Sequence, residues 1–219
     1  MSDYSTEEEQ IAAIKNWWKN NGNSLIIGVG VALLIVFGWK AYQNGVIQDK
    51  TEASMLYQQM IGAATSNNLN APEEGSTVTY LAKELKSKFT TSEYAIYAAM
   101  FIAKESIADG NYDEAKSELN WIISNTEDNR LVHIANGRLA RILSVQGDNE
   151  GALQLLDTND SAFEASYLEI KGDIHSRSND KTAAIEAYTK AYKLVKDAPQ
   201  SLPLLAVKLS NLGIDPETL

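Results

Sequence analysis

The hydropathy pattern is dominated by a charge-free stretch between Lys19 and Lys40, within which Leu25–Trp39 contains no polar residue. Twenty residues of α-helix rise about 30 Å, the thickness of the hydrocarbon core of a bilayer. A single segment satisfies its backbone hydrogen bonds there only as a helix. Aromatic side chains, which favour the membrane interface, flank the stretch at both ends: Trp17, Trp18, Trp39 and Tyr42. The pattern predicts a transmembrane helix over residues 23–42, with the lipid bilayer as a partner.

Two other interpretations of this stretch are a buried core helix and a cleaved signal peptide. A core helix that is apolar on all sides is uncommon behind so short a tail. A signal peptide needs a basic region before the apolar run and a cleavage site of small residues after it. Here the acidic Glu7–Glu9 precede the run, and Lys-Ala-Tyr-Gln-Asn follows it. Both observations favour an uncleaved anchor.

Residues 1–22 are predicted to form a tail that contains a short amphipathic helix. Thr6 followed by Glu7–Glu9 has the pattern of a capping box with acidic residues in the first turn. Ile11, Ile14 and Trp18 fall on one helical face, which suits a helix lying on the membrane surface. Lysines flank the apolar stretch equally on both sides, so the Lys/Arg rule does not decide the orientation.

Two small residues inside the predicted membrane helix, Gly28 and Ala32, are spaced four apart. This small-xxx-small spacing lets a second transmembrane helix approach closely, so the pair is a candidate packing site. The alternative is that these are glycine and alanine residues simply tolerated in a membrane helix. The sequence does not choose between them.

From about Asp49 onward, apolar residues recur with a period close to 3.6, which is typical of amphipathic helices. The first two stripes are separated by a loop predicted over residues 67–76, where Asn, Pro and Gly gather. No segment alternates with a period of two, so the pattern predicts no β-sheet. The stripes are Ala53, Leu56 and Met60, then Val78, Leu81, Ala82, Leu85 and Phe89.

Three similar turns, at residues 109–115, 146–152 and 178–184, each lie between two predicted helices. Each has a Gly or Asn that can adopt the left-handed backbone conformation, and an Asp or Asn that can cap the next helix. Each ends on an alanine, predicted to be buried where paired helices touch: Ala115, Ala152 and Ala184. A last helix is predicted to bury Leu202, Leu205, Leu209 and Leu212 and to end at Gly213.

These segments resemble the tetratricopeptide repeat, a helical hairpin with a period of 34 residues. In the best-matching copy Gly172, Ala184, Tyr188 and Ala191 stand at repeat spacing, although the tryptophan and the closing proline of the repeat are absent. We therefore expect an all-α protein, with one N-terminal transmembrane helix followed by a tetratricopeptide-repeat-like α-solenoid. A plain stack of helical hairpins is the alternative.

Composition and motifs favour binding over catalysis. From Ala41 onward 16 Lys and Arg stand against 25 Asp and Glu, a formal charge of −9 that argues against nucleic-acid binding. There is no cysteine, and no nucleophile elbow, phosphate loop or zinc-protease motif. His133 and His175 are interpreted as ordinary helical residues, and Asp109, Asp113, Asp148 and Asp180 as helix caps. We expect no enzyme, no cofactor and no metal site.

Stacked repeats present a concave surface built from the first helix of each pair. The repeat pattern places seven residues on that surface, which we predict to bind partners: Tyr97, Met100, Lys104, Ile134, Arg141, Glu169 and Arg177. The alternative for each is a residue that only faces solvent.

The order of parts resembles the YfgM family, the ancillary subunits of the SecYEG translocon in Gram-negative bacteria. The resemblance rests on an acidic tail, Ile-Lys-Asn-Trp-Trp-Lys-Asn-Asn-Gly at 14–22, an anchor ending in Gly38 and Trp39, and later segments at 53–57 and 139–141. It implies an inner-membrane protein with a cytoplasmic N-terminus (1–22), a membrane helix (23–42) and a periplasmic domain (43–219). It also implies association with SecYEG, the periplasmic chaperone PpiD and newly translocated secretory proteins.

Two other functions remain open at this point. One is a generic cell-envelope scaffold that assembles a different membrane complex. The other is an enzyme whose site leaves no motif, which would show itself as a pocket with converging titratable groups. Copurification from gently solubilised membranes separates the translocon subunit from the scaffold.

Overall fold

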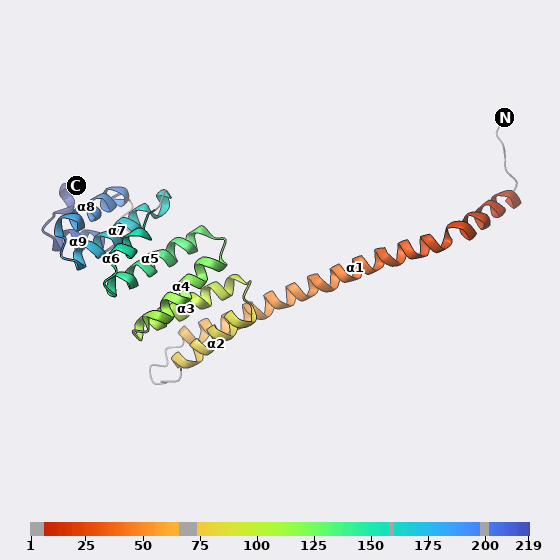
Figure 1. Ribbon diagram of the computed structural model, residues 1–219, viewed down its shortest axis with the longest axis horizontal. Coiled ribbons are helices and arrows are strands. Elements are labelled where there is room, and N and C mark those ends of the chain that lie inside the picture. The colour runs from red at the N-terminus through yellow and green to blue at the C-terminus, as the bar shows by residue number, and fades with distance from the viewer. Residues whose placement is uncertain (1–6, 66–73, 158–159, 198–201) are drawn as a thin grey trace, which may run out of the picture. The chain divides into compact units, whose positions relative to one another are not determined.

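The computed structural model describes residues 7–65, 74–157, 160–197 and 202–219. Within these ranges the chain is helical and has no strand, which confirms the all-α prediction. The chain forms two compact units, Met1–Glu52 and Ala53–Leu219. The α-helices, labelled in Figure 1, are α1 (Glu7–Thr65), α2 (Glu74–Lys88), α3 (Glu93–Ala108), α4 (Tyr112–Asn125), α5 (Asn129–Val145), α6 (Asn149–Gln154), α7 (Ser161–Arg177), α8 (Lys181–Val195) and α9 (Leu205–Asn211). A short 3₁₀ turn (Pro216–Thr218) follows α9.

The first unit is the greater part of helix α1, which contains the one described segment long and apolar enough to cross a membrane. Its apolar side chains lie exposed along the helix; Leu34, for example, is 74% exposed. This exposure is inconsistent with a buried core helix. Gly28 has no atom within 4 Å of the position a Cβ would take, and Ala32 is exposed, so both small residues lie open on the helix.

Helix α1 runs without interruption from Glu7 to Thr65, whereas the sequence pattern divided this region into a tail helix, a membrane helix and a first domain stripe. The physical reason is that the segment has no proline, and each internal glycine costs a helix only about 1 kcal/mol. The predicted cap at Thr6 lies outside the described residues, as does most of the predicted loop at 67–76. Helix α2 begins inside that loop range, at Glu74.

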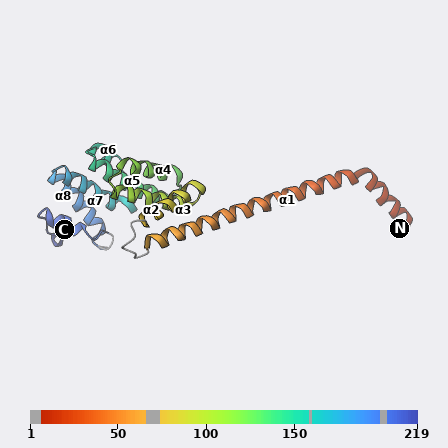
Figure 2. The same cartoon turned by 90° about the horizontal axis from the view of Figure 1, so that it is seen from below.

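The second unit is a row of antiparallel helices in which each packs mainly on its neighbours in sequence, as in a solenoid. Figure 2 shows the same helices from below. Four small cores follow one another along the row instead of one central core. The first joins Ala53 and Met60 of α1 to α2 and α3, the second joins α3, α4 and α5, the third joins α5, α6 and α7, and the last joins α8 to α9.

The three repeated turns have the geometry that the sequence predicts. Gly110, Gly147 and Asn179 adopt positive φ angles of 74°, 91° and 62°. At the first turn the Asn111 N–H donates to the Ser106 carbonyl at 2.7 Å, and the Gly110 N–H donates to the Ile107 carbonyl at 3.1 Å. The other two turns repeat these two bonds, so each helix ends in a Schellman motif that satisfies its last carbonyl groups.

Small residues set the distance between the helices of a pair. Ala115, Ala152 and Ala184 are completely buried, which confirms the prediction made from the repeat. Gly172 on α7 lies directly against the ring of Tyr188 on α8, where a Cβ would come within 2.4 Å of two ring carbons. Only glycine allows this approach.

Helix α9 covers the end of the row. Leu205 and Leu209 are buried, and Gly213 follows the helix with a positive φ of 84°. The predicted leucine face is therefore present, but α9 is shorter than the pattern indicated. Leu202 and Leu212 lie just outside the helix and pack against the same core.

Candidate functional site

The predicted residues of α3 lie at the edge of the second and first cores. Tyr97 is 40% exposed, and its ring centroid lies 5.9 Å from that of Tyr57. Met100 is half-buried. Lys104 is exposed, and its ammonium pairs with the Glu105 carboxylate at 3.1 Å. Tyr97 and Lys104 are thus accessible, while Met100 packs against the second core.

Helix α5 presents Ile134, which is 42% exposed, and Arg141, which is also exposed. Arg138 stands between them, and sequence reasoning missed it although it is spaced four from Ile134 and three from Arg141. The Arg138 Nη1 lies 3.5 Å from the Met100 sulfur, so this side chain joins α5 to α3, the first helices of two successive pairs. Burial, and secondarily the positive charge of Arg141, lower the pKa of Arg138 below its ordinary value.

Helix α7 places its two predicted residues differently. Glu169 is only 8% exposed, and its carboxylate accepts from the Lys208 ammonium at 2.8 Å. The same ammonium lies 2.6 Å from the Asp173 carboxylate, so Lys208 of α9 covers this part of α7. Arg177 donates from Nη1 to the Ser144 hydroxyl of α5 at 2.8 Å. Glu169 is therefore buried in an ion pair within the domain, whereas the repeat pattern placed it on an open face.

Two hollows lie between α3 and α5, one at each end of the pair. A hollow of about 440 Å³ lies at the start of both helices and is lined by Tyr97, Asp128 and Arg130 among others. A smaller hollow of about 160 Å³ lies at their other end, beside Arg138 and Arg141. We call this side of α3 and α5, which carries Tyr97, Lys104, Ile134 and Arg141 together with the two hollows, the first-helix face, and it is the candidate binding surface.

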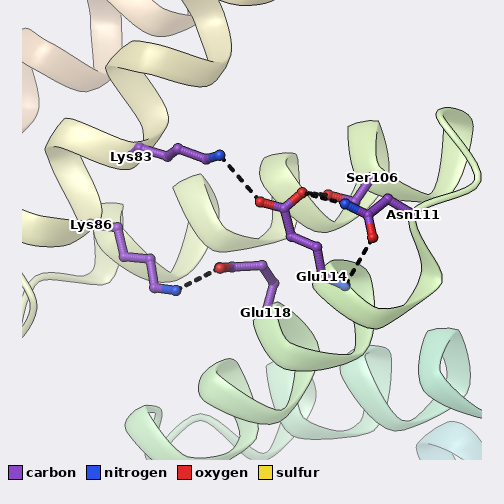
Figure 3. Close-up of polar contacts among 6 residues, drawn as sticks. All are labelled: Lys83, Lys86, Ser106, Asn111, Glu114 and Glu118. Carbon is purple, nitrogen blue, oxygen red and sulfur yellow. Dashed lines mark hydrogen bonds and ion pairs between the residues drawn. The ribbon is translucent and has the colours of Figure 1, made fainter.

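A polar cluster on α2, α3 and α4 has a structural role (Figure 3). The Glu114 carboxylate accepts from Ser106 at 3.0 Å and from Asn111 at 3.1 Å, and lies 3.2 Å from the Lys83 ammonium. These contacts lower the pKa of Glu114, with the Ser106 hydrogen bond contributing most. Beside it Lys86 pairs with Glu118 at 2.7 Å. The cluster ties successive helices together, and every charge in it is already compensated.

The two histidines are helical residues with local partners. His133 Nδ1 lies 2.9 Å from the Tyr167 hydroxyl, and its ring stacks on Phe163 with centroids 4.4 Å apart. His175 Nδ1 lies 3.9 Å from the Asp180 carboxylate. Among the described residues no group of three or more His, Cys, Asp or Glu side chains could hold a metal ion.

The aspartates of the repeated turns divide into two kinds. Asp148 and Asp180 cap α6 and α8, accepting from the Gly151 and Ala183 N–H groups at 2.9 and 3.1 Å. At the first turn the cap of α4 is Asn111 instead. Asp109 follows the end of α3, and Asp113 pairs with Lys116 at 3.0 Å. Asp148 and Asp180 therefore cap the next helix as predicted, whereas Asp109 is the C-cap residue of α3 and Asp113 lies in the first turn of α4, so neither of these caps the next helix.

Comparison with known proteins agrees with this architecture. Curated relatives named "Ancillary SecYEG translocon subunit" match over nearly the whole chain, which confirms the resemblance to the YfgM family. The relative from Haemophilus influenzae is 26% identical over 95% of this chain and 99% of its own length. The one from Escherichia coli is 25% identical over 98% and 100%, and the one from Aggregatibacter actinomycetemcomitans is 29% identical over 95% and 99%. No solved structure gives a significant match.

A protein-family model described as a tetratricopeptide repeat-like domain matches residues 15–214, a range that includes the membrane-helix candidate as well as the stacked helices. The chain retains two features of the repeat: turns in which a Gly or Asn with positive φ precedes an Asp or Asn cap, and the buried alanines described above. Because the model covers most of its length, the chain belongs to the tetratricopeptide repeat-like domain family.

Proposed function

We propose that this protein is an ancillary subunit of the SecYEG translocon, anchored in the bacterial inner membrane by a single helix. The observation that carries the proposal is the full-length similarity to relatives bearing that name, across both the apolar part of α1 and the stacked helices. In this arrangement residues 1–22 lie in the cytoplasm, residues 23–42 span the bilayer, and residues 43–219 lie in the periplasm.

The repeat domain acts in this proposal as an interaction module beside the channel. Its first-helix face contacts periplasmic chaperones such as PpiD and newly translocated secretory proteins. Confinement at the membrane raises the effective concentration of such partners towards the millimolar range, so weak contacts are sufficient. The open pair Gly28 and Ala32 provides a place where a transmembrane helix of a partner can pack.

Site-specific photocrosslinking in living cells tests the partners. A photoreactive residue at Tyr97 or Arg141, on the first-helix face, should trap SecYEG, a chaperone such as PpiD, or a secretory protein. The matched control is Ser117, an exposed residue on the second helix α4, which should trap much less. Recovery of no secretion component, by crosslinking or by copurification in mild detergent, would contradict the translocon assignment and leave a generic envelope scaffold.

Cysteine labelling tests the orientation, and the natural absence of cysteine gives a clean background. One cysteine replaces Ser5, which lies outside the described residues, and another replaces Ser178, which is exposed at the turn before α8. An impermeant maleimide added to intact spheroplasts should label position 178 and leave position 5 protected. The opposite labelling pattern would reverse the proposed topology.

A further inference from the structure

The smaller hollow between α3 and α5 combines an apolar floor with two arginines, and we name it the Arg138 pocket. Its volume of about 160 Å³ is well below the roughly 300 Å³ at which pockets for small-molecule ligands begin. It therefore has room for about one side chain. It is lined by Ile107, Tyr112, Arg138, Arg141, Ile142 and Val145.

The charge in this pocket is not compensated within the described protein. None of the ion pairs among the described residues includes Arg138 or Arg141, whereas Arg130, for comparison, lies 2.7 Å from the Asp128 carboxylate. The contact recorded for the Arg138 guanidinium is the Met100 sulfur, a weak acceptor. A half-buried cation beside a second cation is unfavourable, and an added anion would relieve this.

The missing carboxylate distinguishes this pocket from several other contacts between helices. The part from Ala41 onward has nine more acidic than basic residues, and the cations Lys83, Lys86 and Lys208 all have acidic partners across helix pairs. Arg138 is half-buried without such a partner among the described residues and lies three residues from Arg141 on the same helix, so this pair of arginines marks a place that can accept an anion from outside.

We propose that the Arg138 pocket binds an extended polypeptide segment in which an Asp or Glu side chain lies next to an aliphatic side chain. The two guanidinium groups offer planar donors that match a carboxylate, and the apolar floor takes the neighbouring side chain. A polypeptide is favoured over an anionic lipid surface because the domain carries a formal charge of −9, which such a surface repels. The inference rests on the proposed role of the first-helix face and names the chemistry of its partner.

Fluorescence anisotropy with the full-length protein in mild detergent tests the proposal. The probe is a labelled peptide of Gly and Ser with a central Leu-Glu pair, blocked at both ends so that the Glu side chain is its one carboxylate. Arg138→Met keeps the apolar stem and removes the charge, and Arg141→Gln changes an exposed position. The control is Lys190→Gln on the second helix α8, which removes a cation that is already paired with Glu186.

Each of the two pocket variants should weaken binding about tenfold, the effect of losing one charge-assisted hydrogen bond. Lys190→Gln should bind as the unmodified protein does. Replacing Glu by Gln or Leu by Ser in the peptide should also weaken binding, and so should raising the salt concentration. Circular dichroism checks that each variant is folded. Val145→Glu is a further variant, at a 48% exposed position on the rim of the pocket. Its carboxylate would pair with the arginines from within the chain, so this variant should also bind the peptide more weakly.

Unchanged affinity in Arg141→Gln and Val145→Glu would overturn the proposal, as would binding only of peptides with a free C-terminal carboxylate. Preferential binding of anionic over zwitterionic vesicles, lost in Arg138→Met, would assign the pocket to lipid and overturn it as well. The translocon assignment is tested separately by copurification of SecYEG with the unmodified full-length protein. If peptide binding fails and copurification persists, this inference is wrong while the proposed function stands.

Discussion

The contact between Gly172 and Tyr188 gives the sharpest test of how the repeat holds its helices together. Replacing Gly172 by Ala adds a methyl group 2.4 Å from two ring carbons of Tyr188, where ordinary contacts begin at 3.4 Å, so the ring or the helix must move by about 1 Å. Tyr188 cannot move freely, because it is 3% exposed and its hydroxyl donates to the Asp173 carboxylate at 2.8 Å.

Two opposing effects set the magnitude. Alanine is a better helix former than glycine by about 1 kcal/mol. Overpacking a core costs about 1–3 kcal/mol, and loss of the Tyr188–Asp173 hydrogen bond would add about 1 kcal/mol. We therefore expect Gly172→Ala to lower the free energy of unfolding by about 2 kcal/mol. For a domain of this size that corresponds to a fall in Tm of about 4–8 °C.

The measurement is urea unfolding of the full-length protein in mild detergent, followed by far-UV circular dichroism. The matched control is Gly62→Ala, an exposed helical position of α1 where the new methyl group meets no atom within 4 Å. It should gain up to about 1 kcal/mol from helix propensity alone. If both variants were stabilised equally, the close approach of α7 and α8 at Gly172 would be wrong.

Three further predictions concern the same pair of helices and the cap beyond it. Ala184→Leu overpacks a completely buried contact and should lower the free energy of unfolding by about 1–3 kcal/mol, whereas an effect no larger than that of a surface change would refute the repeat register. Lys208→Met leaves Glu169 and Asp173 without their cation. It should lower the free energy of unfolding by about 2 kcal/mol at pH 7, measured by the same urea unfolding. Burial, and secondarily the Asp173 carboxylate, raise the pKa of Tyr188 above its ordinary value of about 10. As the pH rises, the unfolded chain therefore loses the Tyr188 proton before the folded protein does. The free energy of unfolding, measured by urea unfolding at several pH values, should fall above about pH 10, and less steeply in Tyr188→Phe.

Much of the fold could be predicted because its signals are local. The turns at Gly110 and Gly147 need residues that tolerate positive φ, and the capping bonds at Asp148 and Asp180 reach only three residues along the chain. The buried alanines follow from the same local spacing. The candidate site was less predictable. Arg138 was missed because its role depends on the absence of an acidic partner in the described part of the folded domain, which the sequence does not reveal. Its spacing of three residues from Arg141 was the one available signal.

The sequence by itself determined the membrane-helix candidate, the helical class and the junctions between helix pairs, because hydrophobic period, backbone conformation and capping act within a few residues. Only the tertiary structure decided which polar groups are compensated. Glu169 looked like a surface residue until α9, 39 residues later in the chain, brought Lys208 to it. Arg138 and Arg141 came to border an apolar hollow because Ile107 and Tyr112 of neighbouring elements pack beside α5. Charge pairing across helices depends on distances that packing fixes, and no pattern along one helix contains them.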